Sequence, residues 1–468
     1  MAPKVPVDKT FRVFAPDQGL LLPPSLDDWL PAGHVARFIA DLVDEHLDLS
    51  RIYAAYTDVR GGPPYDPRLM VRILLHGYTT GVRSSRKLEA ACVDVVAFRW
   101  LAAGSAPDYR AIARFRKRHL SALGHLFVQA LALCQTAGMV SLGRVALDGT
   151  KVRANASRRK AMSYARMTEK EKVLADEVSA LLAEAERIDK AEDKQFGKDK
   201  RGDELPAELA RRESRLAKIR EAKAALEQEA ADAAREHAEA KARERGDDDD
   251  DAAAAAGEAA AAVPKPKAQR NFTDPDAKIM LTGDKSFHPC YNAATVVDAD
   301  HQVIVATELG DNAADTATLI PMTDATVTNA GQVPGQVLAD AGYSSNTNCD
   351  AAAEFTIGVG TEFFIAPGRQ PHGEPAPIAP RGRIPNSATA KQRMARTLAT
   401  KRGQAIYARR KAIVEPVFGQ MHTLQNAKHL LLRGIEQARG EWLLLAACHN
   451  LRKLHGHIGV AGLATLPG

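Results

Sequence analysis

Hydrophobic residues near the start of the chain recur at the three- and four-residue spacing of amphipathic helices, between proline and glycine residues that mark helix ends. The segment from Pro67 to Gly81 places Leu69, Ile73 and Leu74 on one face. Gly81 supplies a helix stop, and Ser84 supplies an N-cap for the next helix. This pattern predicts a helix, a short turn and a second helix.

A third helix is predicted after Asp108, which can cap it, with Ile112 and Phe115 facing inward. Four basic residues share its other side at positions i, i+4, i+7 and i+8, which suits contacts with phosphate groups. A solvated helix face is the alternative interpretation of this stripe. Its members are Arg110, Arg114, Lys117 and Arg118.

From Ser141 the pattern becomes strand-like, and Val145 to Leu147 form an apolar run that leads into Asp148. Later strands first follow one another and then alternate with helices, which favours a mixed sheet flanked by helices. The further predicted elements are a hairpin over 291–307, a helix over about 313–329, strands over 336–339 and 362–365, and a helical tail from Ile406.

The sheet pattern is interrupted over residues 165–258, which are dominated by Ala, Glu, Lys and Arg. Apolar residues recur there at alternating spacings of four and three, which is typical of a coiled-coil seam, and a break falls at 202–206. We expect an inserted antiparallel helical hairpin followed by a flexible linker that contains Asp247 to Asp251. The seam residues are Leu174, Val178, Leu181, Ala185, Ile188, Leu209, Leu216, Ile219 and Leu226.

Three carboxylates are candidates for metal chemistry. Asp148 and Asp340 each follow an apolar strand, and Glu415 lies opposite the apolar face of a helical stretch. If they converge, their hard oxygen ligands could hold two Mg²⁺ ions about 3.5–4 Å apart, an arrangement suited to phosphodiester chemistry.

Each carboxylate also has a purely structural interpretation. Asp148-Gly149 is a common hairpin-turn dipeptide, Asp340 could cap the next segment, and Glu415 could precede a helix that begins at Pro416. Other acids compete, and Asp298 is expected at a hairpin tip. The full competing set is Asp274, Asp276, Asp298 and Asp311.

Charge is unevenly distributed along the 468 residues. The chain carries 63 Lys/Arg against 58 Asp/Glu, a net of +5, but residues 165–258 hold 19 against 27 and the remainder 44 against 31. Residues 381–411 contain ten Lys/Arg and no acid directly before Glu415, which suits a surface that faces a phosphate backbone; a flexible basic loop is the alternative. The basic residues are Arg381, Arg383, Lys391, Arg393, Arg396, Lys401, Arg402, Arg409, Arg410 and Lys411.

The five cysteines are scattered singly, without a CxxC pair, so neither a disulfide framework nor a structural zinc site is expected. The first residues lack the apolar core of a signal peptide, and no stretch approaches the roughly 18 apolar residues of a membrane span. These features predict a soluble protein of the cytoplasm.

Taken together, the motifs resemble those of the DDE transposases of insertion sequences, which have an RNase H-like catalytic domain. The resemblance implies that Asp148, Asp340 and Glu415 bind metal and are catalytic, and that the N-terminal helices bind DNA. It is carried by residues 62–67, 81–86 and 108–116, by Leu147-Asp148-Gly149-Thr150-Lys151, by Leu338-Ala339-Asp340-Ala341-Gly342-Tyr343, by residues 409–420 and by residues 449–454.

One position departs from the family. Relatives commonly carry a lysine on the turn after the glutamate, where it can contact DNA, and this chain has His422. Since the usual histidine pKa is about 6.5, the phosphate contact there is expected to be weaker or pH-dependent, or to pass to Arg410 and Lys411. The DNA-binding candidates are Arg110, Arg114, Lys117, Arg118, Arg402, Arg409, Arg410, Lys411 and His422.

The resemblance implies a transposase that binds the terminal inverted repeats of its insertion sequence and performs Mg²⁺-dependent strand cleavage and strand transfer into target DNA, with Mn²⁺ as a possible substitute. A homodimer in a synaptic complex and association with the nucleoid are expected. The alternatives are a metal-dependent nuclease that does not join DNA and a non-catalytic DNA-binding or assembly protein. A strand-transfer assay separates the two enzymes.

The expected fold is an α/β catalytic domain, RNase H-like, with a mixed sheet flanked by helices, together with an all-α N-terminal domain and an inserted helical coiled-coil hairpin. The expected boundaries are 1–138 for the N-terminal DNA-binding domain, 139–160 plus 269–460 for the catalytic domain, 161–245 for the hairpin and 246–268 for the linker.

Overall fold

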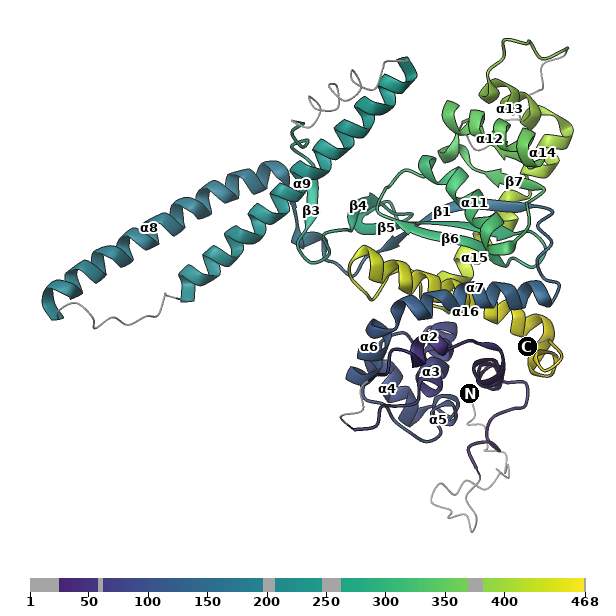
Figure 1. Cartoon of the computed structure of the whole chain (residues 1–468), viewed down its shortest axis with the longest axis horizontal. Coiled ribbons are helices and arrows are strands. Elements are labelled where there is room, and N and C mark those ends of the chain that lie inside the picture. The colour runs from purple at the N-terminus through teal and green to yellow at the C-terminus, as the bar shows by residue number, and fades with distance from the viewer. Residues whose placement is uncertain (1–24, 58–61, 197–206, 246–261, 369–381, 467–468) are drawn as a thin grey trace, which may run out of the picture.

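The computed structural model describes residues 25–57, 62–196, 207–245, 262–368 and 382–466. It has a helical N-terminal region, a mixed sheet with flanking helices, and two long helices that project away from the sheet (Figure 1). The whole predicted break at 202–206, residues 246–261 of the predicted linker and Arg381 lie outside the described residues.

The N-terminal region is helical, as the sequence predicts. The predicted helix that ends at Gly81 is observed: Asp66 caps it by accepting from the backbone N of Arg68 at 2.8 Å, and Gly81 ends it with φ +84°. The elements are α1 (Val35–Asp41), a π-helical turn (Leu42–His46), α2 (Ser50–Tyr53), α3 (Pro67–Thr80), α4 (Ser85–Asp94), α5 (Val96–Leu101), α6 (Tyr109–Arg118) and α7 (Leu120–Thr136).

Helix α6 is the third predicted helix. The Asp108 carboxylate accepts from the backbone N of Arg110 at 2.8 Å, and Ile112 and Phe115 are buried. Burial of these two side chains turns the opposite face of α6 outward, so all four residues of the predicted basic stripe are exposed.

The sheet has the strand order β4-β5-β1-β7-β8, and β6 also pairs with β5. Strand β5 is antiparallel to β4, β1 and β6, whereas β1, β7 and β8 are parallel. The predicted mixed sheet and its hairpin are therefore observed. The strands are β1 (Val145–Arg153), β4 (Lys278–Leu281), β5 (Phe287–Asp298), β6 (Ile304–Gly310), β7 (Gln336–Ala339) and β8 (Glu362–Ile365).

One structural alternative for this sheet is excluded. Asp148 and Gly149 do not form a turn, because β1 continues through them to Arg153 and stays paired with β5 along its whole length. Asp298 lies at the end of β5, at the hairpin turn into β6, as predicted. It is fully buried there, and its carboxylate accepts from the backbone N of Leu142 at 2.9 Å.

Helices cover the sheet, and one extensive hydrophobic core joins them to the N-terminal helices. Figure 1 shows α7 and α16 between the sheet and α2 to α6. The remaining flanking helices are α11 (Leu319–Ala330), α12 (Asn346–Val359), α13 (Ala390–Ala399), α14 (Lys401–Tyr407), α15 (Arg410–Leu424) and α16 (Ile435–Leu463). The five cysteines, all within this body, are buried and free.

Two alternatives for the basic segment and its neighbour are also excluded. From Ala390 onward the segment forms α13 and α14 rather than a loop. Helix α15 begins at Arg410, so Glu415 does not precede a helix that starts at Pro416; that proline lies inside α15.

A buried ion pair fastens the N-terminal helices to the sheet domain. Arg83 donates to the Glu441 carboxylate of α16 at 3.0 Å, and the two side chains are 2% and 0% exposed. Arg83 also donates to the backbone O of His429, and Glu441 accepts from the backbone N of Leu431 at 2.8 Å. The backbone of Arg153 in β1 bonds to Lys428 and Leu430 of the same loop, so the pair lies next to the end of β1.

The insertion contains α8 (Tyr164–Phe196) and α9 (Ala207–Arg245), and a short antiparallel ladder of β2 (Ala161–Ser163) and β3 (Gln269–Asn271) forms its base. Glu171 pairs with Lys223 at 2.9 Å and Glu177 with Arg212 at 3.5 Å, so the two helices run antiparallel. Buried side chains between them include four seam residues, Leu174, Leu216, Ile219 and Leu226; the side chains of Ala185, Ile188 and Leu209 lie outside the description.

Candidate active site

Asp148 lies in β1, and Asp340 lies beside it, directly after the neighbouring parallel strand β7. Leu147 of β1 pairs with Ala339 of β7, and the two aspartates directly follow this pair. Parallel strands carry registered residues toward the same edge of a sheet, which is why two positions 192 residues apart in sequence meet. Asp148 belongs to β1, which continues, whereas β7 ends immediately before Asp340.

Asp148 is largely buried and forms an ion pair with Arg410 at the start of α15. Arg410 Nη1 donates to Asp148 Oδ2 at 2.8 Å, and the two side chains are 9% and 18% exposed. Burial raises the pKa of Asp148 above its usual range, the Arg410 charge opposes that shift, and the negative charge of Asp340 adds to it. The two carboxylates repel each other, and a cation bound beside them would relieve that repulsion. The pair therefore favours binding of a cation.

Asp340 caps the short 3₁₀ turn that follows it. Its Oδ1 accepts from the backbone N of Gly342 at 2.8 Å, and the residue is half-buried. The expectation of a structural capping role is therefore met, and the same position also keeps the carboxylate beside Asp148. Only one carboxylate oxygen accepts this bond, so capping of the turn leaves the other oxygen able to bind a ligand.

A third acid, Asp315, adjoins this pair and was missed from the sequence. Asn292 Nδ2 donates to Asp315 Oδ1 at 2.6 Å, and Lys151 Nζ lies 3.3 Å from the same oxygen. A Cβ on Gly149 would lie 2.6 Å from that oxygen, and a Cβ on Gly342 would lie 3.0 Å from Asp340 Oδ1 and 3.4 Å from Asp315 Oδ2. Both glycines therefore leave the room that the acidic side chains fill.

Sequence signals for Asp315 were weak. It falls between a strand and a helix in a polar stretch that includes Asp311 and Asn312, and nothing in that stretch distinguishes one acid from another. The glycine after Asp148 and the glycine two positions after Asp340 were visible, and each fits a site where a side chain comes close to the backbone.

Glu415 is exposed on α15, and its neighbours Val414 and Val417 are fully buried. The helix packs against β1 and β5, so Glu415 belongs to the element that brings Arg410 to Asp148. Across the described residues, which include all three predicted ligands, no group of three or more His, Cys, Asp or Glu side chains is arranged to hold a metal ion. The oxygen donors of Asp148 and Asp340 fit Mg²⁺ by chemistry, while Glu415 is not brought to them here.

The exposed basic stripe of α6 is flanked by aromatic rings. The guanidinium groups of Arg86 and Arg110 lie 5.0 and 5.6 Å from the centre of the Tyr109 ring, and that of Arg118 lies 4.9 Å from the Tyr56 ring. Arginines held in this way keep their charge while losing some freedom of movement. The stripe can therefore present ordered cations to a phosphate backbone.

The predicted cations near the carboxylates differ in their availability. Arg409 and Lys411 are exposed, whereas Arg410 is buried and paired with Asp148. Arg402 donates two bonds to the Glu362 carboxylate, at 3.0 and 2.6 Å, so its charge is already matched. Of these four, Arg409 and Lys411 remain the candidates for phosphate contact because their charges are open to solvent.

His422 is half-buried on α15, and its ring stacks near that of Phe418. Burial lowers its pKa below the usual value, and the charge of Lys428 lowers it further. This shift favours the uncharged ring, in contrast to the charged lysine that is common at this position in the family that the motifs resemble.

Two family models match the chain. A transposase domain (DUF772) matches residues 24–118, the part that holds α1 to α6, and a transposase DDE domain matches residues 381–455, which hold α13 to α15 and much of α16. Glu415 lies within the second match, and Asp148 and Asp340 lie outside both. No curated protein and no solved structure matches the chain.

The two matches support an insertion-sequence DDE transposase, the class that the motifs resemble. The matched domains support a transposase function. None of the described helices is both long and apolar enough to cross a membrane.

Proposed function

We propose that the protein binds the terminal inverted repeats of its insertion sequence and catalyses metal-dependent cleavage and transfer of DNA strands, in an RNase H-like catalytic domain. The observation that carries this proposal is the placement of Asp148 in β1 and of Asp340 directly after the adjacent parallel strand β7, beside the basic start of the helix that holds Glu415. Substrate binding and catalysis would then share one edge of the sheet.

Asp148, Asp340 and Glu415 are the residues that would hold two Mg²⁺ ions, with Mn²⁺ as a substitute. A bound divalent metal supplies activation of water or of a DNA 3′-hydroxyl and stabilises the leaving oxygen. Carboxylate oxygens are ligands of the type that Mg²⁺ prefers. Because Glu415 is exposed on α15, binding of metal and DNA would have to bring it toward the two aspartates.

The protein's own side chains have separate tasks in this proposal. Arg410 holds Asp148 in place and favours its ionised form, and Asn292 and Lys151 hold Asp315 beside the pair. The exposed cations of α6, together with Arg409 and Lys411, bind phosphate groups of the end DNA.

Two ends are joined in one transposition event, so a homodimer in a synaptic complex is part of the proposal. We place the domain boundaries at 1–138 for DNA binding, 139–160 with 269–460 for catalysis, 161–245 for a coiled-coil hairpin and 246–268 for the linker. The β2–β3 ladder, which joins the two sides of the insertion, lies at these boundaries.

A strand-transfer assay tests the proposal. The full-length protein is incubated with Mg²⁺, supercoiled plasmid and oligonucleotides that carry the inverted repeats flanking its coding region. Joined products are expected. Cut ends without joining would identify a nuclease, and end binding without cutting would identify a non-catalytic DNA-binding protein.

A further inference from the structure

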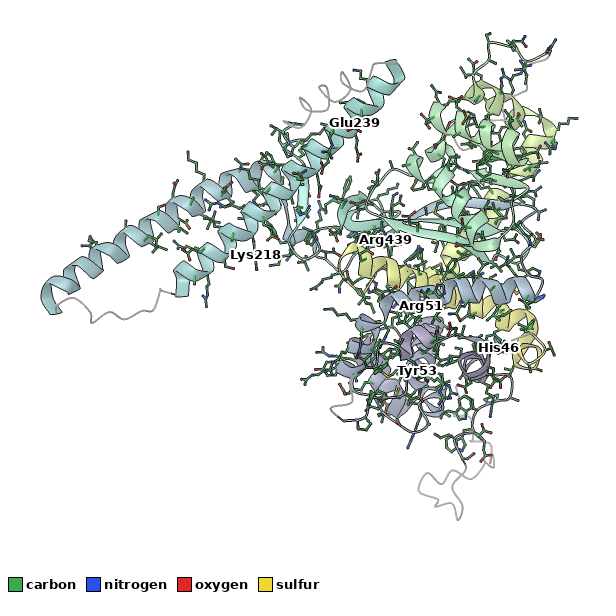
Figure 2. The ribbon with its side chains drawn as sticks, in the orientation of Figure 1. His46, Arg51, Tyr53, Lys218, Glu239 and Arg439 are labelled. Atoms are coloured by element: carbon green, nitrogen blue, oxygen red, sulfur yellow. The ribbon has the colours of Figure 1, made fainter. Side chains whose placement is uncertain are left out.

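A basic cavity lies at the base of the insertion, away from the candidate active site. Its volume is about 550 Å³, and four cations line it: Arg159 and Lys160, which follow β1, and Arg215 and Lys218 of α9. Its apolar lining includes Ile219 and Phe272, and its lining contains no Asp or Glu. Figure 2 labels Lys218 on α9, and Glu239 nearer the other end of that helix.

The charge of these four cations is not neutralised within the described part of the protein. All four side chains are exposed, and none of them has an acidic partner among the described residues. Arg211, one turn before Arg215, lines an adjoining cavity and extends the same charged face. Five cations without an acid on one surface repel one another, so this surface favours an anion.

Other cations near the base of the insertion, in contrast, form ion pairs with acidic side chains. Arg270 and Lys278 share the Glu229 carboxylate, and Arg220 and Lys223 share Glu171 of α8. Helix α9 therefore carries paired cations on the side that faces α8 and unpaired ones on the side that faces the cavity.

We infer that the base of the insertion is a second DNA contact, at which Arg159, Lys160, Arg215 and Lys218 bind the phosphate backbone of the inverted-repeat DNA beyond the cleavage point. The Thr273 side chain, which also lines the cavity, offers a hydroxyl for the same phosphates. This inference rests on the proposed function, because it takes the bound polyanion to be the transposon end.

The position of the cavity fits an extended duplex. Arg153 ends β1 five residues after Asp148, which is about 17 Å along a strand, and the cavity residues follow it. At about 3.4 Å per base pair, this spacing places the contact roughly five or more base pairs from the reacting phosphate. The insertion would thus contact the end DNA at a set distance from the cleavage point, through the phosphate backbone and not through the bases.

The test uses the full-length double variant Arg215→Ala/Lys218→Ala and fluorescence anisotropy with end DNA over a range of salt concentrations. Each lost phosphate contact lowers the slope of log affinity against log salt by about one, so the slope is expected to fall by about two for any DNA sequence. In a footprint of the end DNA, protection of the DNA backbone five or more base pairs from the cleavage point is expected to disappear in this variant.

A matched control removes two exposed cations from α9 outside the cavity, Arg235→Ala/Lys241→Ala, and is expected to keep the wild-type slope. The charge-preserving variant Arg215→Lys/Lys218→Arg is expected to retain most of the slope. Circular dichroism checks that the helices of all variants remain folded.

The outcomes separate this inference from the proposed function. If the wild-type protein binds the end DNA and the cavity variant has an unchanged slope and footprint, the inference is wrong and the proposed function stands. If the wild-type protein shows no salt-sensitive binding to end DNA, both fail. If the cavity variant changes only the oligomeric state, measured by light scattering, the surface binds protein and the DNA contact is excluded.

Discussion

Close approach of side chains to the backbone explains two glycines of the candidate active site. Gly149 follows Asp148, and Gly342 follows Asp340 by two positions; each gives room to an acidic side chain that a Cβ would meet. Gly342 has an ordinary backbone conformation at a turn, and Gly149 lies inside β1. Contact with the acids, rather than unusual backbone angles, therefore accounts for both positions.

Gly149→Ala is expected to destabilise the protein by about 1–3 kcal/mol, since its Cβ would have to displace the Asp315 carboxylate. It should also reduce strand cleavage by disturbing the acids. Urea unfolding and a cleavage assay measure the two effects. Gly143→Ala is the control, because its Cβ would meet no atom closer than 3.7 Å. Equal stability of the two variants would show that Asp315 is not confined there.

Local sequence signals predicted helix caps and buried positions within single helices. They did not predict contacts between residues far apart in the sequence. The cap at Asp108 and the inward positions of Ile112 and Phe115 follow from spacing within one helix. The partner of Asp148 is 262 residues away, and Arg410 was expected to bind DNA rather than a carboxylate. Nothing in local periodicity identifies such a pair.

At the level of elements, the fold was predictable wherever the pattern has a single period. Helix α3, the β5–β6 hairpin and β7 agree with their predictions because each has a clear hydrophobic repeat and marked ends. Asp148-Gly149 left a turn open as an alternative, because this dipeptide is common in hairpin turns; pairing of β1 with β5 overrides that local preference. The basic segment was ambiguous because composition alone does not separate a helix from a loop.

The Arg83–Glu441 pair predicts how the N-terminal helices and the sheet domain depend on each other. Glu441→Gln leaves the buried Arg83 charge without its partner, and a loss of about 3–5 kcal/mol in the free energy of unfolding is expected. Urea denaturation measures it. Glu436→Gln, on the exposed side of the same helix, removes a surface pair with Arg439 and should cost at most about 1 kcal/mol. Similar losses in both variants would contradict the role of the buried pair.

For the whole molecule, buried neutral histidines predict acid sensitivity. Burial lowers the pKa of His449 to about 3 and that of His76 to about 4, below the unfolded value near 6.5. The unfolded chain therefore takes up protons first, so stability is complete above pH 6.5 and falls below it by about 1.4 kcal/mol per pH unit for each histidine.

Urea unfolding at pH 7, 6 and 5 measures this dependence. His449→Gln should make the loss of stability with acid shallower, and His457→Gln, exposed on the same helix, should leave it unchanged. A wild-type stability that does not fall between pH 6.5 and 5 would contradict the assignment of neutral buried histidines.

Charge is divided unevenly between the insertion and the rest of the chain. The mild net charge of +5 combines an acidic insertion with a basic remainder, and the base of the acidic insertion nevertheless carries unpaired cations among the described residues. Net charge by region therefore predicted a basic body. The cavity could be found only from the fold, because its cations come from the turn after β1 and from α9.

We propose that Asp148, Asp340 and Glu415 act together in DNA cleavage. The most direct measurement is Mg²⁺-dependent cleavage of end DNA by Asp148→Asn, Asp340→Asn and Glu415→Gln, with end binding measured in parallel and Asp324→Asn, an exposed acid of α11, as the control. We predict that each of the three variants binds the end normally and does not cleave it, while the control cleaves at the wild-type rate. Cleavage by any of the three at the wild-type rate would contradict the assignment.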